Sequence, residues 1–145
     1  MKKKFTWSYR FTHTALILFL FLLLNSCSKK LQFLQSVAVP AADGSVKIKK
    51  DANKNYSIEI KVLHLAQPDQ LQPSKSNYVI WLETNEHKTR NLGQLKSSSG
   101  FLSKALKASF STVTSFDPKR IFITAEDAPD ISYPTGETIL TTKEF

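Results

Sequence analysis

The stretch Tyr56-Ser57-Ile58-Glu59-Ile60-Lys61-Val62 decides the fold class, because every second residue is apolar and the residues between are polar. Successive side chains of a β-strand point to opposite faces of a sheet, so this alternation predicts a strand with one face in a core and one in water. Residues 46–49 alternate in the same way, and the polar segment 50–55 separates the two stretches. The pair therefore predicts a β-hairpin whose lysines form its wet face.

Short apolar segments separated by turn residues continue this pattern toward the C-terminus. The segment Tyr78-Val79-Ile80-Trp81-Leu82 is apolar on both faces, which is typical of a strand in the middle of a sandwich. Segment 97–100 (SSSG) predicts a flexible connection, and segment 101–107 fits either a strand or a short helical turn. With further strands expected at 92–95, 108–114, 120–126 and 136–142, the total of about seven predicts an all-β domain, a small antiparallel β-sandwich of immunoglobulin-like type over residues 45–145.

Composition and charge narrow the class of protein. The chain has 145 residues, of which 41% are hydrophobic and 22% charged, as expected for one folded domain rather than a disordered chain. The net charge of +8 falls to +4 without the first 26 residues, since 16 basic and 12 acidic residues remain. A charge of this size serves solubility, and we expect no nucleic-acid partner.

Residues 1–26 have the three parts of a secretory signal peptide: a basic start, an apolar run and small residues before a cleavage point. The apolar run, 15–24, covers about 15 Å as a helix, or roughly half of a ~30 Å hydrocarbon core. The segment is therefore expected to be an export signal and not a membrane span.

Leu24-Asn25-Ser26-Cys27 resembles the lipobox that bacterial lipoprotein signal peptidase recognises. The resemblance implies a diacylglycerol thioether on Cys27, cleavage before it and acylation of the new amine, so the membrane is the expected partner of this residue. An incidental thiol after an ordinary signal peptide is the alternative, but the chain has a single cysteine and it stands where the lipobox requires it. Residues 27–44 then form the anchor and a tether that contributes at most a first strand.

The residues after Cys27 bear on the destination of the protein. The position after Cys27 is a serine, Ser28, and not the aspartate that resembles an inner-membrane retention signal. Lys29 and Lys30 follow, where an acidic run would resemble a surface-export signal. We therefore expect an outer-membrane lipoprotein that faces the periplasm.

Four short motifs in order resemble the C-terminal domain of anti-sigma-K factors. They are the strand 78–82 (YVIWL), the segment 92–95 (LGQL), the strand 122–126 (FITAE) and the closing segment 134–140 (PTGETIL). The resemblance as a whole covers roughly residues 46–142. The resemblance implies a β-domain outside the cytoplasm. The His and paired cysteines of the zinc-type anti-sigma signature are absent, so we expect neither direct sigma factor binding nor zinc. Segment 127–133 departs from the family, which has a Pro- and Gly-rich turn there.

Three side chains are candidates for contact with a ligand or partner. Trp81 is expected to fill the core between the sheets, with a ligand platform as the alternative. Glu126 and Thr124 alternate with apolar residues, which predicts solvent-facing strand positions, with a partner contact by Glu126 as the alternative. The ring of Tyr133 is the third candidate. Gly93 and Gly136 are expected to serve backbone conformation or close packing.

No reaction is specified by the sequence, and no cofactor, metal or catalytic residue is expected. His64 and His87 do not stand in metal-ligand spacing, and no nucleophile elbow or phosphate-binding loop occurs. The leading hypothesis is a non-catalytic, membrane-anchored envelope module that binds a protein or cell-wall partner, and the alternative is a carbohydrate or small-ligand binder. A hydrolase would require two or more side chains to converge in a pocket, from the set Glu83, Glu126, Asp127, Asp130 and His87.

Overall fold

The computed structural model describes residues 28–99 and 106–145 as an all-β domain. The expected signal peptide, Cys27 and most of the ambiguous segment 101–107 lie outside the described residues. Within the described part, no helix is long and apolar enough to cross a membrane. The elements are β1 (Ser28–Gln32), β2 (Asp43–Lys50), β3 (Tyr56–Leu63), the 3-10 turn η1 (Pro68–Gln70), β4 (Asn77–Thr84), β5 (Thr89–Leu95), β6 (Ser97–Ser99), β7 (Leu106–Thr114), β8 (Pro118–Glu126) and β9 (Thr138–Thr141).

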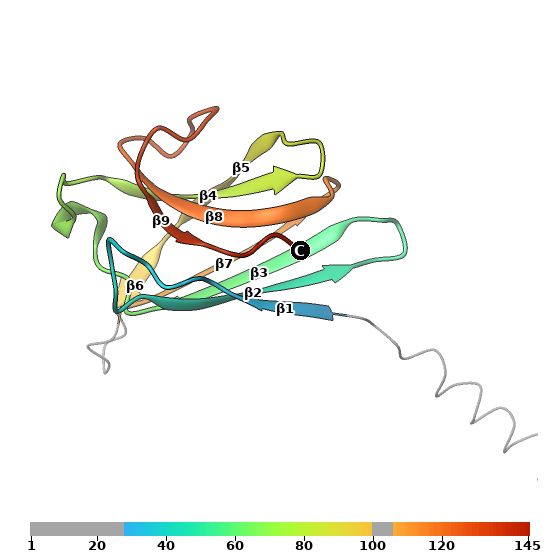
Figure 1. Cartoon of the computed structure of the whole chain (residues 1–145), viewed down its shortest axis with the longest axis horizontal. Helices are drawn as coiled ribbons and strands as arrows, with labels where there is room; N and C mark the ends of the chain where they lie inside the picture. Colours follow the sequence, from blue (N-terminus) through green and yellow to red (C-terminus); the bar gives the residue numbers. More distant parts are fainter. Residues whose placement is uncertain (1–27, 100–105) are drawn as a thin grey trace, which may run out of the picture.

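The strands form two antiparallel sheets that face each other (Figure 1). The first sheet has the order β1-β2-β3-β7-β6 and the second the order β5-β4-β8-β9. If β2 is taken as strand A of an immunoglobulin fold, the sheets read A-B-E-D and C′-C-F-G, with β1 as an extra edge strand. The predicted antiparallel β-sandwich is therefore confirmed.

The predicted hairpin is β2 and β3, and its register explains its alternation. Val46 lies opposite Ile60 and Ile48 opposite Ile58, with these side chains buried in the core. Lys47 lies opposite Glu59 on the other face. The core lies between the sheets, where the apolar residues of β2 and β3 meet those of β4 and β8. The lysines of the hairpin form its wet face as predicted.

The structure has two more strands than the seven expected, because both edges of the first sheet are short strands, β1 and β6, that carry no apolar alternation. The serines of β6 pair with β7, where a flexible connection was expected. The expected tether at 27–44 is mostly part of the domain: β1 pairs with β2 from Ser28 onward, and Phe33, Val39 and Ala42 belong to the core. An edge strand hydrogen-bonds to one neighbour only, so its side chains need no regular pattern.

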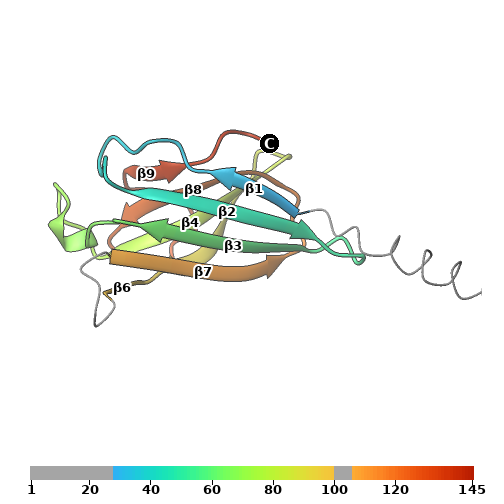
Figure 2. The same cartoon turned by 90° about the horizontal axis from the view of Figure 1, so that it is seen from below.

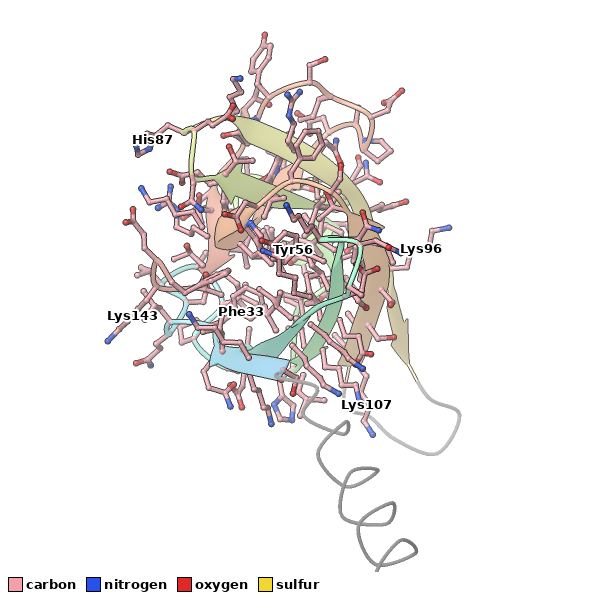
Figure 3. All side chains as sticks on the ribbon, turned by 90° about the vertical axis from the view of Figure 1, so that its right-hand side faces the viewer. Phe33, Tyr56, His87, Lys96, Lys107 and Lys143 are labelled. Carbon is pink, nitrogen blue, oxygen red and sulfur yellow. The ribbon has the colours of Figure 1, made fainter. Side chains whose placement is uncertain are left out.

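The segment after β1 crosses from the first sheet to the second along one side of the sandwich (Figure 2). Leu34 N–H donates to the carbonyl of Thr141 at 2.8 Å, and Phe33 forms a β-bridge with Thr142. Figure 3 looks onto the end of the sandwich at which β1 begins, with Tyr56 near its middle. The Tyr56 hydroxyl donates to the carboxylate of Asp117, which links β3 to the turn before β8 at that end.

Candidate functional site

Trp81 lies on the outer face of the second sheet, away from the core between the sheets. Tyr78, Ile80 and Leu82 point into that core, whereas Val79 and Trp81 belong to a separate apolar cluster with Phe122. The Trp81 and Phe122 rings are stacked, with centroids 6.4 Å apart and planes at 18°. Trp81 is fully buried at 0% exposure. The expected burial of Trp81 is correct, but its expected position between the sheets is wrong, because the outer face is also covered.

The cover is the segment between β8 and β9, residues 127–137, which we call the capping loop. Its Ile131 packs against the Trp81 cluster. Asn91 of β5 holds the loop, since its Nδ2 donates to the carbonyl oxygens of Pro129 and Ile131, each at 2.9 Å. At the start of the loop, Asn77 Nδ2 donates to the carbonyl of Asp127 at 3.1 Å. The loop is therefore attached to the sheet at several points.

A line of hydrogen bonds runs beneath the capping loop. The indole Nε1–H of Trp81 donates to Thr124 Oγ1 at 2.8 Å, and the Thr124 hydroxyl donates to Glu126 Oε1 at 2.6 Å. The Thr135 N–H donates to Glu126 Oε1 at 3.1 Å, and the Thr135 hydroxyl donates to Oε2 at 2.7 Å. The predicted solvent exposure of Thr124 and Glu126 is wrong, since they are 1% and 0% exposed. Their alternation places them on the outer face as predicted, but the loop covers that face there.

Glu126 is the anion around which the capping loop closes. Burial alone raises the pKa of its carboxyl, but hydrogen bonds from Thr124, Thr135 and the backbone of Gly136 outweigh burial and hold the pKa below its ordinary value. The carboxylate is therefore ionised at neutral pH. Gly136 approaches the strand so closely that a Cβ there would lie 1.8 Å from the carbonyl oxygen of Ala125. The close packing expected at Gly136 is confirmed.

Gly93 serves backbone conformation, as expected. Its φ of +131° is disfavoured for residues with a side chain, and it stands where the register between β4 and β5 shifts after Ile80. The Asn91 Oδ1 accepts a hydrogen bond from the Gly93 N–H at 2.8 Å. This irregularity lets the Asn91 amide reach the capping loop.

The surface beside the capping loop is the strongest candidate for a binding site. Tyr133 is 68% exposed on the loop, in contrast to the buried Trp81 and Glu126. Next to it, β5 and the loop form the walls of an open groove of about 610 Å³ that is lined by both polar and apolar residues. Its lining includes Arg90, Asn91, Asp130, Ile131 and Ser132.

The five residues of the hydrolase hypothesis are split between two ends of the sheet. Glu83 Oε1 lies 3.6 Å from His87 Nδ1, and its other oxygen accepts a hydrogen bond from Arg120 Nε at 2.7 Å. Burial raises the pKa of Glu83, but the hydrogen bond and charge of Arg120 bring it below its ordinary value. In the β4–β8 register, Glu83 lies opposite Arg120, and Glu126 lies opposite Asn77. Glu83 and Glu126 are therefore six residues, or about 20 Å, apart along the strand direction.

Sequence reasoning did not anticipate the roles of Asn91 and Thr135, although both stand in or beside the quoted motifs. One signal was available in the sequence. Thr124 and Glu126 stand on a strand next to one whose outer face carries Val79 and Trp81, and an apolar outer face of this kind requires a covering segment. Within the described residues, no three His, Cys, Asp or Glu side chains gather as metal ligands would. Comparisons with protein-family models, with curated proteins and with solved structures found no match to this chain.

Proposed function

We propose that the protein is an exported lipoprotein, anchored in the outer membrane through Cys27, whose β-sandwich is a non-catalytic module that binds a protein or cell-wall partner. The observation that carries the binding role is the capping loop, which the buried Glu126 carboxylate and Asn91 hold in place while Tyr133 stays exposed. The lipobox-like Leu24-Asn25-Ser26-Cys27 supports the anchor.

A fixed loop with an exposed aromatic side chain suits recognition of a large partner. Tyrosine supplies a wide contact area and a hydroxyl at low cost in side-chain entropy, and it is enriched among residues that dominate binding energy. Because the loop is already ordered, binding does not pay for ordering it. The groove beside the loop adds polar groups, such as Asp130 and Ser132, that a partner could contact.

The motifs that resemble the anti-sigma-K C-terminal domain supply the parts of this loop support. Trp81, Thr124, Glu126, Thr135 and Gly136 come from three of those motifs and form one connected network. This connection favours a relationship with the exported part of such factors, and hence a binding or sensing role in the envelope. A cytoplasmic sigma factor is not the partner we expect.

The test is a comparison of Tyr133→Ala with Val113→Ala, a substitution at another exposed apolar side chain, 67% exposed on β7. Partners are cross-linked in the native envelope and recovered with each variant. We expect both variants to unfold at the wild-type temperature and Tyr133→Ala alone to lose about tenfold or more of the recovered partner. Equal recovery with both variants would contradict a binding role for the loop.

A carbohydrate or other small ligand is the second candidate, and the polar groove beside Tyr133 favours it. Aromatic rings commonly stack on sugars, and Tyr133 is the exposed ring of this surface, since Trp81 is buried. Titration of the purified protein with cell-wall glycan fragments distinguishes the two candidates. Saturable glycan binding that Tyr133→Ala removes would favour the small-ligand function over a protein partner.

A further inference from the structure

The outer face of the first sheet carries a group of lysines on three neighbouring strands. Lys30 of β1, Lys47 and Lys49 of β2 and Lys61 of β3 all point away from the core, by their register and burial. Neighbouring strands lie about 4.8 Å apart, so these ammonium groups share one small area. We call these four residues the lysine face.

The positive charge of the lysine face is only partly neutralised within the domain. Among the described residues, none of these four lysines takes part in an ion pair, whereas Lys75, Lys88, Lys119 and Arg120 do. One carboxylate, that of Glu59, lies among the four lysines, opposite Lys47. Asp43 is on the same outer face of the sheet, but it lies beyond the C-terminal end of β1. The face therefore keeps an excess of positive charge.

The shape of the face suits small anionic groups better than an apolar partner. The small side chains of Ser28 and Ser45 leave a hollow of about 350 Å³ between the longer lysines. The hollow is lined by Ser28, Lys30, Ser45, Lys47, Glu59 and Lys61, so three ammonium groups and two hydroxyls stand against one carboxylate, with lysine methylene groups forming part of the wall. A lysine is a mobile point charge with three donors, which suits phosphate groups that vary in position.

The position of the chain's cysteine brings this face to a membrane. Ser28 is the first residue of β1 and directly follows Cys27, so no spacer separates the lipid attachment point from the sheet. Lys30 is three residues from Cys27, or about 10 Å of extended chain. Attraction between lysines and an anionic bilayer extends over a Debye length, about 8 Å at physiological ionic strength.

We propose that the lysine face lies on the bilayer and binds the phosphate groups of anionic phospholipids, which orients the domain. The inference rests on the proposed anchor at Cys27. In this orientation the second sheet faces away from the membrane, and the capping loop with Tyr133 points to the aqueous space (Figure 1). The lipid thus supplies attachment, and the lysine face supplies orientation.

The test uses the mature lipoprotein reconstituted into vesicles and the reactivity of an introduced thiol. Lipidation consumes the native cysteine, so Ser111→Cys places one free thiol on the outer face of β7, opposite Glu59 of β3. Ser132→Cys places the control thiol on the exposed capping loop. A membrane-impermeant maleimide is added to vesicles of phosphatidylethanolamine with phosphatidylglycerol, or of phosphatidylcholine alone.

We expect the thiol at position 111 to react at least tenfold more slowly in the anionic vesicles than in the neutral ones, and the thiol at 132 to react equally in both. High salt should remove the difference. The triple variant K30Q/K47Q/K61Q should remove it too, since each lysine contributes about fivefold to binding an anionic surface. The variant K75Q/K88Q/K96Q, with the same change in net charge, should keep it.

Equal reactivity at position 111 in both vesicles would overturn the proposal, as would protection that persists in the K30Q/K47Q/K61Q variant. If the thiol at position 111 is slow to react in both kinds of vesicle, contact between copies of the chain would explain the protection instead of anionic lipid. The mass of the purified protein tests the anchor separately. A mass without acyl groups would remove the anchor itself, whereas acylated protein without protection at position 111 would refute the orientation alone.

Discussion

Replacing Glu126 by glutamine removes the charge beneath the capping loop and leaves the side-chain volume nearly unchanged. One of the two acceptor oxygens becomes an NH2 group, which faces donors from Thr135 or from Thr124 instead of accepting their hydrogen bonds. Hydrogen bonds to a charged group contribute about 1.5–3 kcal/mol each, against about 0.5–1.5 for neutral pairs. Losing one acceptor and weakening the other bonds should lower the free energy of unfolding by about 2–4 kcal/mol.

Urea unfolding followed by tryptophan fluorescence measures this change directly. The chain has two tryptophans, Trp7 in the proposed signal peptide and Trp81 in the network, so protein expressed from residue 28 onward reports on Trp81 alone. We expect a lower urea midpoint and a red shift of the emission before global unfolding, as the loop releases the ring. Glu137→Gln makes the same charge change at an exposed residue of the same loop and should alter stability by less than about 0.5 kcal/mol.

The pH dependence provides a second measurement of the same effect. Because the folded-state pKa of Glu126 lies below its ordinary value of 4.5, its ionised form contributes stability that is fully present above about pH 4.5. That contribution is lost as the pH falls through the lower, folded-state pKa. The stability difference between wild type and Glu126→Gln should therefore be constant from pH 5 to 7 and narrow below about pH 4.5. A difference that widens in acid, or an equal loss in Glu137→Gln, would refute the reasoning.

Three further substitutions test other parts of the structure. Trp81→Ala should cost about 3–5 kcal/mol in thermal unfolding through lost burial and a cavity, and an unchanged melting temperature would disprove its burial. Gly136→Ala should displace the capping loop, because its Cβ would meet the carbonyl of Ala125 at 1.8 Å; faster proteolysis within 127–137 is the readout, and wild-type resistance would contradict the close contact. Cys27→Ser should abolish labelling by an alkyne fatty acid, and equal labelling of mutant and wild type would end the lipoprotein proposal.

The hairpin of β2 and β3 could be predicted because each strand has one buried and one wet face, which produces period-two alternation. The strand around Trp81 could be recognised as buried on both faces, but the sequence does not say what covers each face. One face meets the other sheet, and the other lies beneath the capping loop, where Asn91 and Trp81 contact Ile131, which is 40 and 50 positions away in the chain. Such pairings depend on tertiary structure and leave no local pattern.

Thr124 and Glu126 show the same limit from the polar side. Their alternation with Ile123 and Ala125 indicates the outer face correctly, but polarity alone does not distinguish an exposed residue from one that is buried with hydrogen-bond partners. The sequence indicates β1 only as an optional first strand within a tether, because the alternation around it is broken and its Ser-Lys-Lys start is polar. Pairing with β2 supplies the backbone hydrogen bonds that order it.

The pairing of β1 with β2 also determines how the protein would carry mechanical load. The proposed lipid anchor at Cys27 directly precedes Ser28, while the capping loop lies at the opposite end of the strands (Figure 1). Sideways movement of a cell-wall partner relative to the membrane would therefore pull along the strand direction. Antiparallel hydrogen bonds lie perpendicular to the strands, so this pull would load all five β1–β2 residue pairs in shear at once. A domain joined to the proposed anchor in this way would resist detachment better than one whose edge strand could be separated one residue pair at a time.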